Sequence, residues 1–143
     1  MKERHSPMRY RTSYWIGAAL LLVAAVAVVA VSRYIRAEVQ RDLAEQRRDE
    51  LKKALGIEND PVAYLGDLLR EAVTSGQHPR GDDVEKLLRG YEEKSKIGEY
   101  TYYFFFIRQS LIRGRCGAYV AVKYSEDGVV TDVGWDSAGL LPR

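Results

Sequence analysis

Cysteine and histidine are nearly absent from this chain of 143 residues, which holds only Cys116, His5 and His78. A single cysteine excludes an internal disulfide and a metal site built from several cysteines. Two histidines far apart in the sequence leave too few ligands for a histidine-based metal centre. The sequence also lacks a glycine-rich phosphate loop and a nucleophile elbow. We therefore expect no metal, no cofactor and no enzymatic activity.

An excess of charge of one sign is also missing. The chain has 22 Lys and Arg against 20 Asp and Glu, for a net charge of +2. Proteins that bind nucleic acid through a polybasic surface carry a much stronger basic bias. We therefore expect no nucleic-acid partner. The length allows one small domain with attachments.

A long uncharged stretch is the strongest feature that the sequence does have. No charged residue occurs from Thr12 to Ser32, and 21 helical residues rise about 31 Å, the thickness of a bilayer's hydrocarbon core. A remainder this small could not enclose a helix that is apolar on every side. The sequence therefore predicts a transmembrane helix over residues 12–32. Aromatic and basic side chains that suit the membrane interface flank it: Arg11, Tyr14, Trp15, Arg33 and Tyr34.

The orientation of a membrane span is predicted by comparing the numbers of basic residues on its two sides. Lys and Arg are equally frequent before and after it, so the N-terminal amine breaks the tie. We expect a cytoplasmic basic tail at residues 1–11 and an extracytoplasmic C-terminal part, in the inner (cytoplasmic) membrane of a bacterial envelope. The triplet Ala25-Val26-Ala27 is alternatively a signal-peptidase pattern. The apolar run continues to Val31, which favours a retained anchor.

Residues 33–55 are predicted to form a charged helical stalk. They contain no Gly or Pro, and opposite charges recur at helical spacing, as in Arg41 and Glu45. The apolar positions are spaced by four or eight residues, whereas a coiled coil alternates three and four. We expect a solvated stalk with one modest apolar edge, formed by Ile35, Val39, Leu43, Leu51 and Leu55; homo-oligomerisation through it is possible but not favoured.

Residues 56–143 are predicted to form a small α+β domain of two layers, with two helices on a three-stranded antiparallel sheet. Asp60 and Pro61 are typical of an N-cap and first helical residue, and Asp82 is expected to cap a second, short helix. Strands are expected at residues 100–108, 117–124 and 129–135, with a Ser125–Gly128 turn before the last strand and a loose tail at residues 136–143.

Part of this domain resembles a known family. The segment Asp83-Val84-Glu85-Lys86-Leu87-Leu88-Arg89-Gly90 and the later Val120–Tyr124 strand with its Asp127-Gly128 turn resemble the SmpA/OmlA (BamE-like) small α+β family, over roughly residues 62–135. The resemblance implies a protein-interaction module outside the cytoplasm. Members of that family carry an N-terminal lipid-attached cysteine, whereas this chain has a spanning helix instead.

Two groups of residues are candidates for partner binding. A sheet covered on one face cannot bury every aromatic residue of its strands, and leftover aromatics are typical of interfaces. The alternative is that they fill the core. These candidates are Tyr103, Phe105, Tyr119 and Trp135. The basic loop residues Arg108, Arg113 and Arg115 suit anionic lipid headgroups or an acidic partner, or form an ordinary solvated loop.

These features predict a single-pass, membrane-anchored, non-catalytic interaction module. Its partners would be the lipid bilayer and another membrane or envelope protein, and it would serve as an accessory or assembly subunit of a larger membrane complex. The alternative is an extracytoplasmic ligand-sensing or inhibitor domain on a membrane anchor. We expect Cys116 to be a small buried hydrophobe, although a bond to another chain is also open.

Overall fold

The computed structural model describes residues 8–143. The chain divides into two compact units, Met1–Arg36 and Ala37–Arg143. The first helix, α1 (Met8–Leu55), supplies residues to both units. Residues 1–7 of the predicted basic tail lie outside the described residues.

The first unit contains the uncharged stretch. This stretch is helical throughout, and its apolar side chains are exposed, as for Leu21 at 75%. The helix is long and apolar enough to cross a membrane. The unit is therefore compatible with a single-pass anchor. The five anchor candidates flanking the run, Arg11, Tyr14, Trp15, Arg33 and Tyr34, are all exposed.

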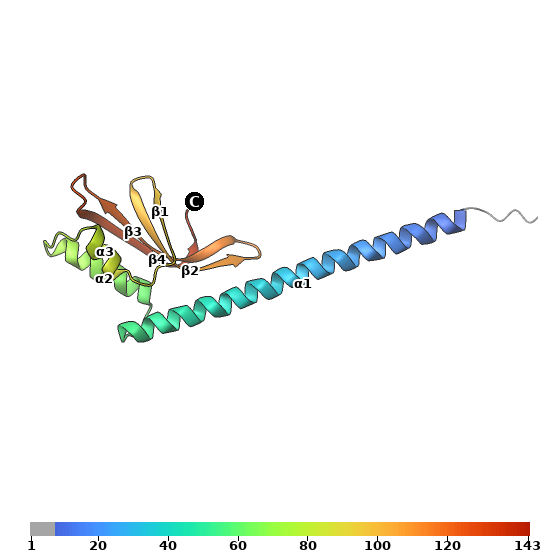
Figure 1. The fold of residues 1–143 in the computed structure, drawn as a ribbon, viewed down its shortest axis with the longest axis horizontal. Coiled ribbons are helices and arrows are strands. Elements are labelled where there is room, and N and C mark those ends of the chain that lie inside the picture. The colour runs from blue at the N-terminus through green and yellow to red at the C-terminus, as the bar shows by residue number, and fades with distance from the viewer. Residues whose placement is uncertain (1–7) are drawn as a thin grey trace, which may run out of the picture. The chain divides into compact units, whose positions relative to one another are not determined.

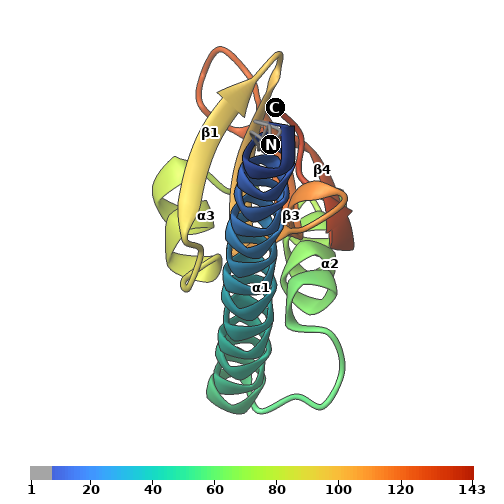
Figure 2. The ribbon, with the colours of Figure 1, turned by 90° about the vertical axis from the view of Figure 1, so that its right-hand side faces the viewer.

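The second unit is an α+β domain built on a four-stranded antiparallel sheet. The strands β1 (Glu93–Ile97), β2 (Tyr100–Ser110), β3 (Gly114–Tyr124) and β4 (Val130–Leu140) are neighbours in chain order. Two helices, α2 (Pro61–Thr74) and α3 (Gly81–Leu87), lie on one side of the sheet (Figure 1). α2 packs along β3 and β4, and α3 lies on the β1 side (Figure 2). The predicted class is correct, but the predicted three strands omit β1.

Strand register assigns each side chain to a face, because residues paired across antiparallel strands point to the same side. Tyr103 pairs with Val120, and Val120 pairs with Trp135; this row faces the helices. Phe104 pairs with Tyr119, and Tyr119 pairs with Asp136. This second row therefore lies on the face that α2 and α3 leave open.

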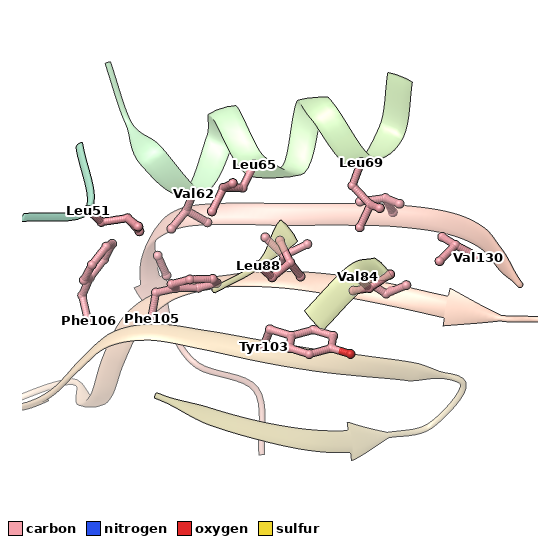
Figure 3. Close-up of a cluster of buried hydrophobic side chains, with 14 of the residues drawn as sticks. Leu51, Val62, Leu65, Leu69, Val84, Leu88, Tyr103, Phe105, Phe106 and Val130 are labelled. Atoms are coloured by element: carbon pink, nitrogen blue, oxygen red, sulfur yellow. The ribbon is translucent and has the colours of Figure 1, made fainter. Parts of the chain in front are cut away.

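The core fills the space between the sheet and the helices (Figure 3). Tyr103 and Phe105 of β2 are both fully buried there. The prediction that these two residues bind a partner is therefore wrong, because the helices cover them. Their helical neighbours are the apolar residues of α2 and α3, namely Val62, Leu65, Leu69, Val84 and Leu88.

The end of α1 also belongs to this core. Ala44 is 4% exposed and Leu51 is 8% exposed, and Figure 3 places Leu51 beside Phe106. The two residues are seven apart and so lie on one face of the helix. The apolar edge expected on this stalk is therefore partly used in the core: Leu51, which belongs to that edge, is covered by the domain together with Ala44.

A β-bulge brings two successive phenylalanines into the core. The register between β2 and β3 shifts between Phe105 and Arg108, and Phe106 has a φ of 53°. An extra residue in one strand interrupts the alternation of faces, so Phe106 joins Phe105 on the helical side. Gly117 lies opposite the bulge, where an added Cβ would come within 2.7 Å of the Phe105 carbonyl oxygen.

The predicted N-cap is correct for α2 but not for α3. The Asp60 carboxylate accepts hydrogen bonds from the Val62 and Ala63 amides at 2.9 and 3.0 Å, so the predicted N-cap of α2 is confirmed. For α3 the prediction is wrong by two residues. The helix begins at Gly81, and the Asp83 carboxylate accepts from the Arg80 amide at 3.0 Å.

The predicted Ser125–Gly128 turn is confirmed. The Ser125 amide donates to the Val129 carbonyl at 2.8 Å, and Gly128 has the positive φ, 76°, that such a turn needs. The prediction of a loose tail is wrong up to Leu140, since β4 continues to that residue and Leu141 is buried behind it.

Substituting Gly117 tests the bulge. Gly117→Ala should lower the free energy of unfolding by about 1–3 kcal/mol, because the methyl group meets backbone atoms that cannot move aside freely. Gly134→Ala on β4 is the matched control, since no atom lies within 4 Å of its added Cβ, and it should be neutral or slightly stabilising. Denaturant titration of the detergent-solubilised chain compares them; equal effects of the two substitutions would refute the close approach.

Candidate interaction surfaces

The open face of the sheet has an aromatic centre. The ring of Tyr102 stacks on Phe104, with 5.9 Å between centroids, and meets the edge of Tyr119 at 5.2 Å. The Arg115 guanidinium lies 5.5 Å from the centre of the Phe104 ring. Phe104 is thereby almost fully covered, while Tyr102 and Tyr119 remain half-buried. These three rings are called the aromatic cluster below.

Small residues lie directly beside the aromatic cluster. Tyr102 pairs with Ala121, and Ala121 pairs with Gly134, so these three share the open face. An added Cβ at Gly134 would meet no atom within 4 Å. Ala121 is buried, at 5% exposure, so the open space beside the two tyrosines lies over Gly134. Burial, followed by the charge of Asp136, raises the pKa of the Tyr119 phenol, so it stays protonated at neutral pH.

Polar contacts surround this centre. The Tyr100 hydroxyl donates to the Asp132 carboxylate at 2.5 Å across β3, and Lys123 pairs with Glu99 at 2.7 Å. The hydrogen bond from Tyr100 lowers the pKa of Asp132, and the same bond raises the pKa of Tyr100. Because of these two pKa shifts, Tyr100 is a neutral phenol and Asp132 an ionised carboxylate at every pH near neutrality, which is the state that forms the hydrogen bond.

The four aromatic candidates from the sequence are thus divided between the two faces. Only Tyr119 lies on the open face. Trp135 lies on the helical face, where an added Cβ at Gly66 would come within 2.7 Å of its ring and the Arg70 guanidinium lies 4.1 Å from its centre. The prediction that Trp135 contacts a partner is therefore not supported by its position, because α2 covers it. Tyr102 belongs to the same run of strand aromatics, and its alternation with Tyr103 places it on the open face.

A second surface lies where α1 meets the β2–β3 end of the sheet. Two pockets of about 170 and 340 Å³ occur there, and Arg108 lines both of them. The first is also lined by Arg41, Arg48 and Phe106, and the second by Leu43 and Arg47. Arginine is the commonest residue of both linings, so this basic end is suited to anionic groups.

Most of these arginines are already engaged within the domain. Arg47 pairs with Glu92 at 2.7 Å, and Arg48 pairs with Asp60 at 3.3 Å and donates to the Ser137 carbonyl at 3.0 Å. Among the three basic candidates from the sequence, Arg115 forms an ion pair with Glu93. Arg108 and Arg113 are exposed and have no acidic partner in residues 8–143. These two arginines therefore remain available for an external anion.

The other candidate residues are not assembled into a reactive centre. Cys116 is buried at 7% exposure, with its Sγ 3.7 Å from the Gly114 carbonyl oxygen. His78 is exposed in the loop before α3. Within the described part of the chain, no three His, Cys, Asp or Glu side chains are grouped so that they could hold a metal ion.

Comparison of the chain with protein-family models, with curated proteins and with solved structures yields no match.

The Tyr100–Asp132 hydrogen bond predicts a pH dependence. A carboxylate whose pKa is lower in the folded state adds stability above its unfolded pKa of about 4, and this stability is lost as pH falls through the folded value. Tyr100→Phe removes the bond, so it should destabilise the protein at pH 6–7 and have less effect near pH 2. Unfolding free energies of both proteins across this range test it; a difference that does not change with pH would contradict the assignment.

Proposed function

We propose that this protein is a single-pass, membrane-anchored interaction module that docks another membrane or envelope protein on the open face of its sheet. It is non-catalytic and serves as an accessory or assembly subunit of a larger complex. The observation that carries the proposal is the aromatic cluster, whose two half-buried tyrosines lie near the open position Gly134, on a chain whose first unit contains an exposed apolar helix.

The chemistry of the open face supports a protein partner. Half-buried tyrosines supply a large contact area and a hydroxyl, and such residues are enriched at interfaces. The charged pairs around the aromatic cluster form the polar rim that interfaces of this kind have. The pockets of about 170 and 340 Å³ described above lie at the basic end and are not lined by the aromatic cluster.

The apolar helix supports anchoring as the mechanism. A helix of this length buries its side chains in a bilayer, and confinement to a membrane raises the effective concentration of the domain near a partner in the same membrane. We place the N-terminus in the cytoplasm and the domain outside the inner membrane, on the positive-inside argument given above. The resemblance to the SmpA/OmlA (BamE-like) family agrees with an extracytoplasmic interaction domain.

The anchor is tested by fractionation. The full chain should stay with the membrane after alkaline carbonate extraction and keep its N-terminal residues, because the apolar helix is retained in the bilayer. A reporter fused after Arg143 should be active outside the cytoplasm. Recovery from the aqueous fraction of a chain that begins after Ala27 would overturn the anchor, and a cytoplasmic reporter signal would overturn the orientation.

The docking face is tested by placing a large side chain at Gly134. Gly134→Arg should leave the domain folded, because the position is open, but should place a long side chain beside Tyr102 and Tyr119. Gentle detergent extraction with quantitative mass spectrometry should show a partner that co-purifies with the native chain and is reduced tenfold or more, on the order of a hot-spot loss.

The matched control is Gln77→Arg, which adds the same charge at an exposed loop position away from the sheet. It should retain the partner. A complex that survives Gly134→Arg, or that both variants lose equally, would show that the open face is not the docking surface.

A further inference from the structure

The β2–β3 hairpin ends in an exposed apolar tip. Ile112 is 95% exposed and Leu111 is 54% exposed, and no other large hydrophobic residue in the described part of the second unit is as exposed as Ile112. The tip is held in place by Ser110, whose hydroxyl accepts from the amides of Ile112 and Arg113 at 3.4 and 3.3 Å. Two adjacent apolar side chains are therefore presented to solvent at the end of an ordered hairpin.

Unpaired positive charge accompanies this tip. Arg113 adjoins Ile112, and Arg108 lies two residues before Ser110 on β2. Neither has an acidic partner in residues 8–143, in contrast to Arg47, Arg48 and Arg115 nearby. An apolar tip with free arginines matches the interface of an anionic bilayer, where hydrocarbon and phosphate lie next to each other.

The hairpin lies against the part of α1 that belongs to the second unit. Contacts within the second unit pair Arg48 with the Phe106 ring at 5.0 Å, Arg47 with the Ile107 carbonyl at 3.4 Å, and Gln40 with the Gln109 amide at 2.9 Å. Successive residues of β2 therefore contact successively earlier residues of α1. The tip, residues 111–113, follows Gln109 in the chain, so it lies beyond the residue of β2 that contacts Gln40.

The chain itself limits how far this end of the domain can be from the membrane. Gln40 is eight residues after Ser32, the last residue of the uncharged stretch. In a helix these eight residues rise about 12 Å, which is comparable to the thickness of a headgroup layer. The residue that the hairpin contacts is therefore tethered close to the bilayer surface.

We propose that the hairpin tip, Leu111–Arg113, inserts into the headgroup region of the anionic membrane that holds the anchor, with Arg108 and Arg113 on lipid phosphates. This second contact would hold the domain at the membrane surface. The inference rests on the proposed membrane anchoring, but not on the proposed docking face.

The test uses an environment-sensitive fluorophore on the full chain in vesicles. Ile112→Cys is labelled in a Cys116→Ser background, and Asp127→Cys, at the exposed tip of the β3–β4 hairpin, is the matched control. In vesicles containing phosphatidylglycerol, the label at position 112 should shift to the blue and be quenched by lipids carrying quenchers near the headgroups. The label at position 127 should stay in water.

The two arginines supply the second arm. Arg108→Gln and Arg113→Gln should each weaken insertion of the tip roughly fivefold, as expected for a basic residue at an anionic surface, and phosphatidylcholine alone should also weaken it. Arg89→Gln, at an exposed position following α3, is the control and should have no effect.

The outcomes separate the two proposals. If the labelled chain does not float with the vesicles, the anchor itself fails. If it floats but the label at position 112 remains in water, the anchor stands and the hairpin proposal is overturned. A label that is shielded in native membranes but not in pure lipid vesicles would also overturn it, because a protein would then cover the tip.

Discussion

Burial of the end of α1 in the domain is the interaction on which the rest of the structure depends. Ala44 and Leu51 enter the same core as α2, α3 and the sheet. Arg48 reinforces this packing through Asp60, the Ser137 carbonyl and the Phe106 ring. One continuous helix thus carries an apolar span near its start and core residues near its end. Ala44, the first of these core residues, is twelve residues after Ser32, the last residue of the uncharged stretch.

That packing also determines which surfaces remain free. Because α1, α2 and α3 cover one side of the sheet, Tyr103, Phe105 and Trp135 are used for stability. The opposite side carries the aromatic cluster, with Tyr102 and Tyr119 half-buried beside Ala121 and Gly134. The basic end is a different surface, where Arg47, Arg48 and Arg115 are paired with Glu92, Asp60 and Glu93. The two surfaces therefore differ in chemistry, and we propose a protein partner for the open face and anionic lipid for the hairpin tip.

The sequence predicts those elements whose signals are local. The uncharged stretch, the Asp60 N-cap and the Ser125–Gly128 turn each depend on residues close together in the chain, and each is found where it was expected. The sequence did not predict β1, which is an edge strand with the sequence Glu-Lys-Ser-Lys-Ile. Charged residues suit an exposed edge, but with a single apolar residue the segment shows no alternation of apolar and polar positions.

The division of the aromatic residues was beyond the reach of local patterns. Residues 102–106 are all aromatic, so alternation alone gives no sign of which face meets the helices. The bulge then places Phe106 on the same side as Phe105, an arrangement that only the partner strand and Gly117 reveal. Likewise, the sequence of residues 33–55 shows an apolar edge that includes Leu51, but it does not show that the domain covers Leu51 and Ala44.

Hydrogen exchange of the full chain in detergent, followed across increasing denaturant, tests most directly whether α1 is part of the domain. If the end of α1 is part of the domain, the amides of residues 44–51 lose protection together with those of Val120 and Val122, in one cooperative step. Loss of protection in residues 44–51 at much lower denaturant, while β3 stays protected, would contradict it.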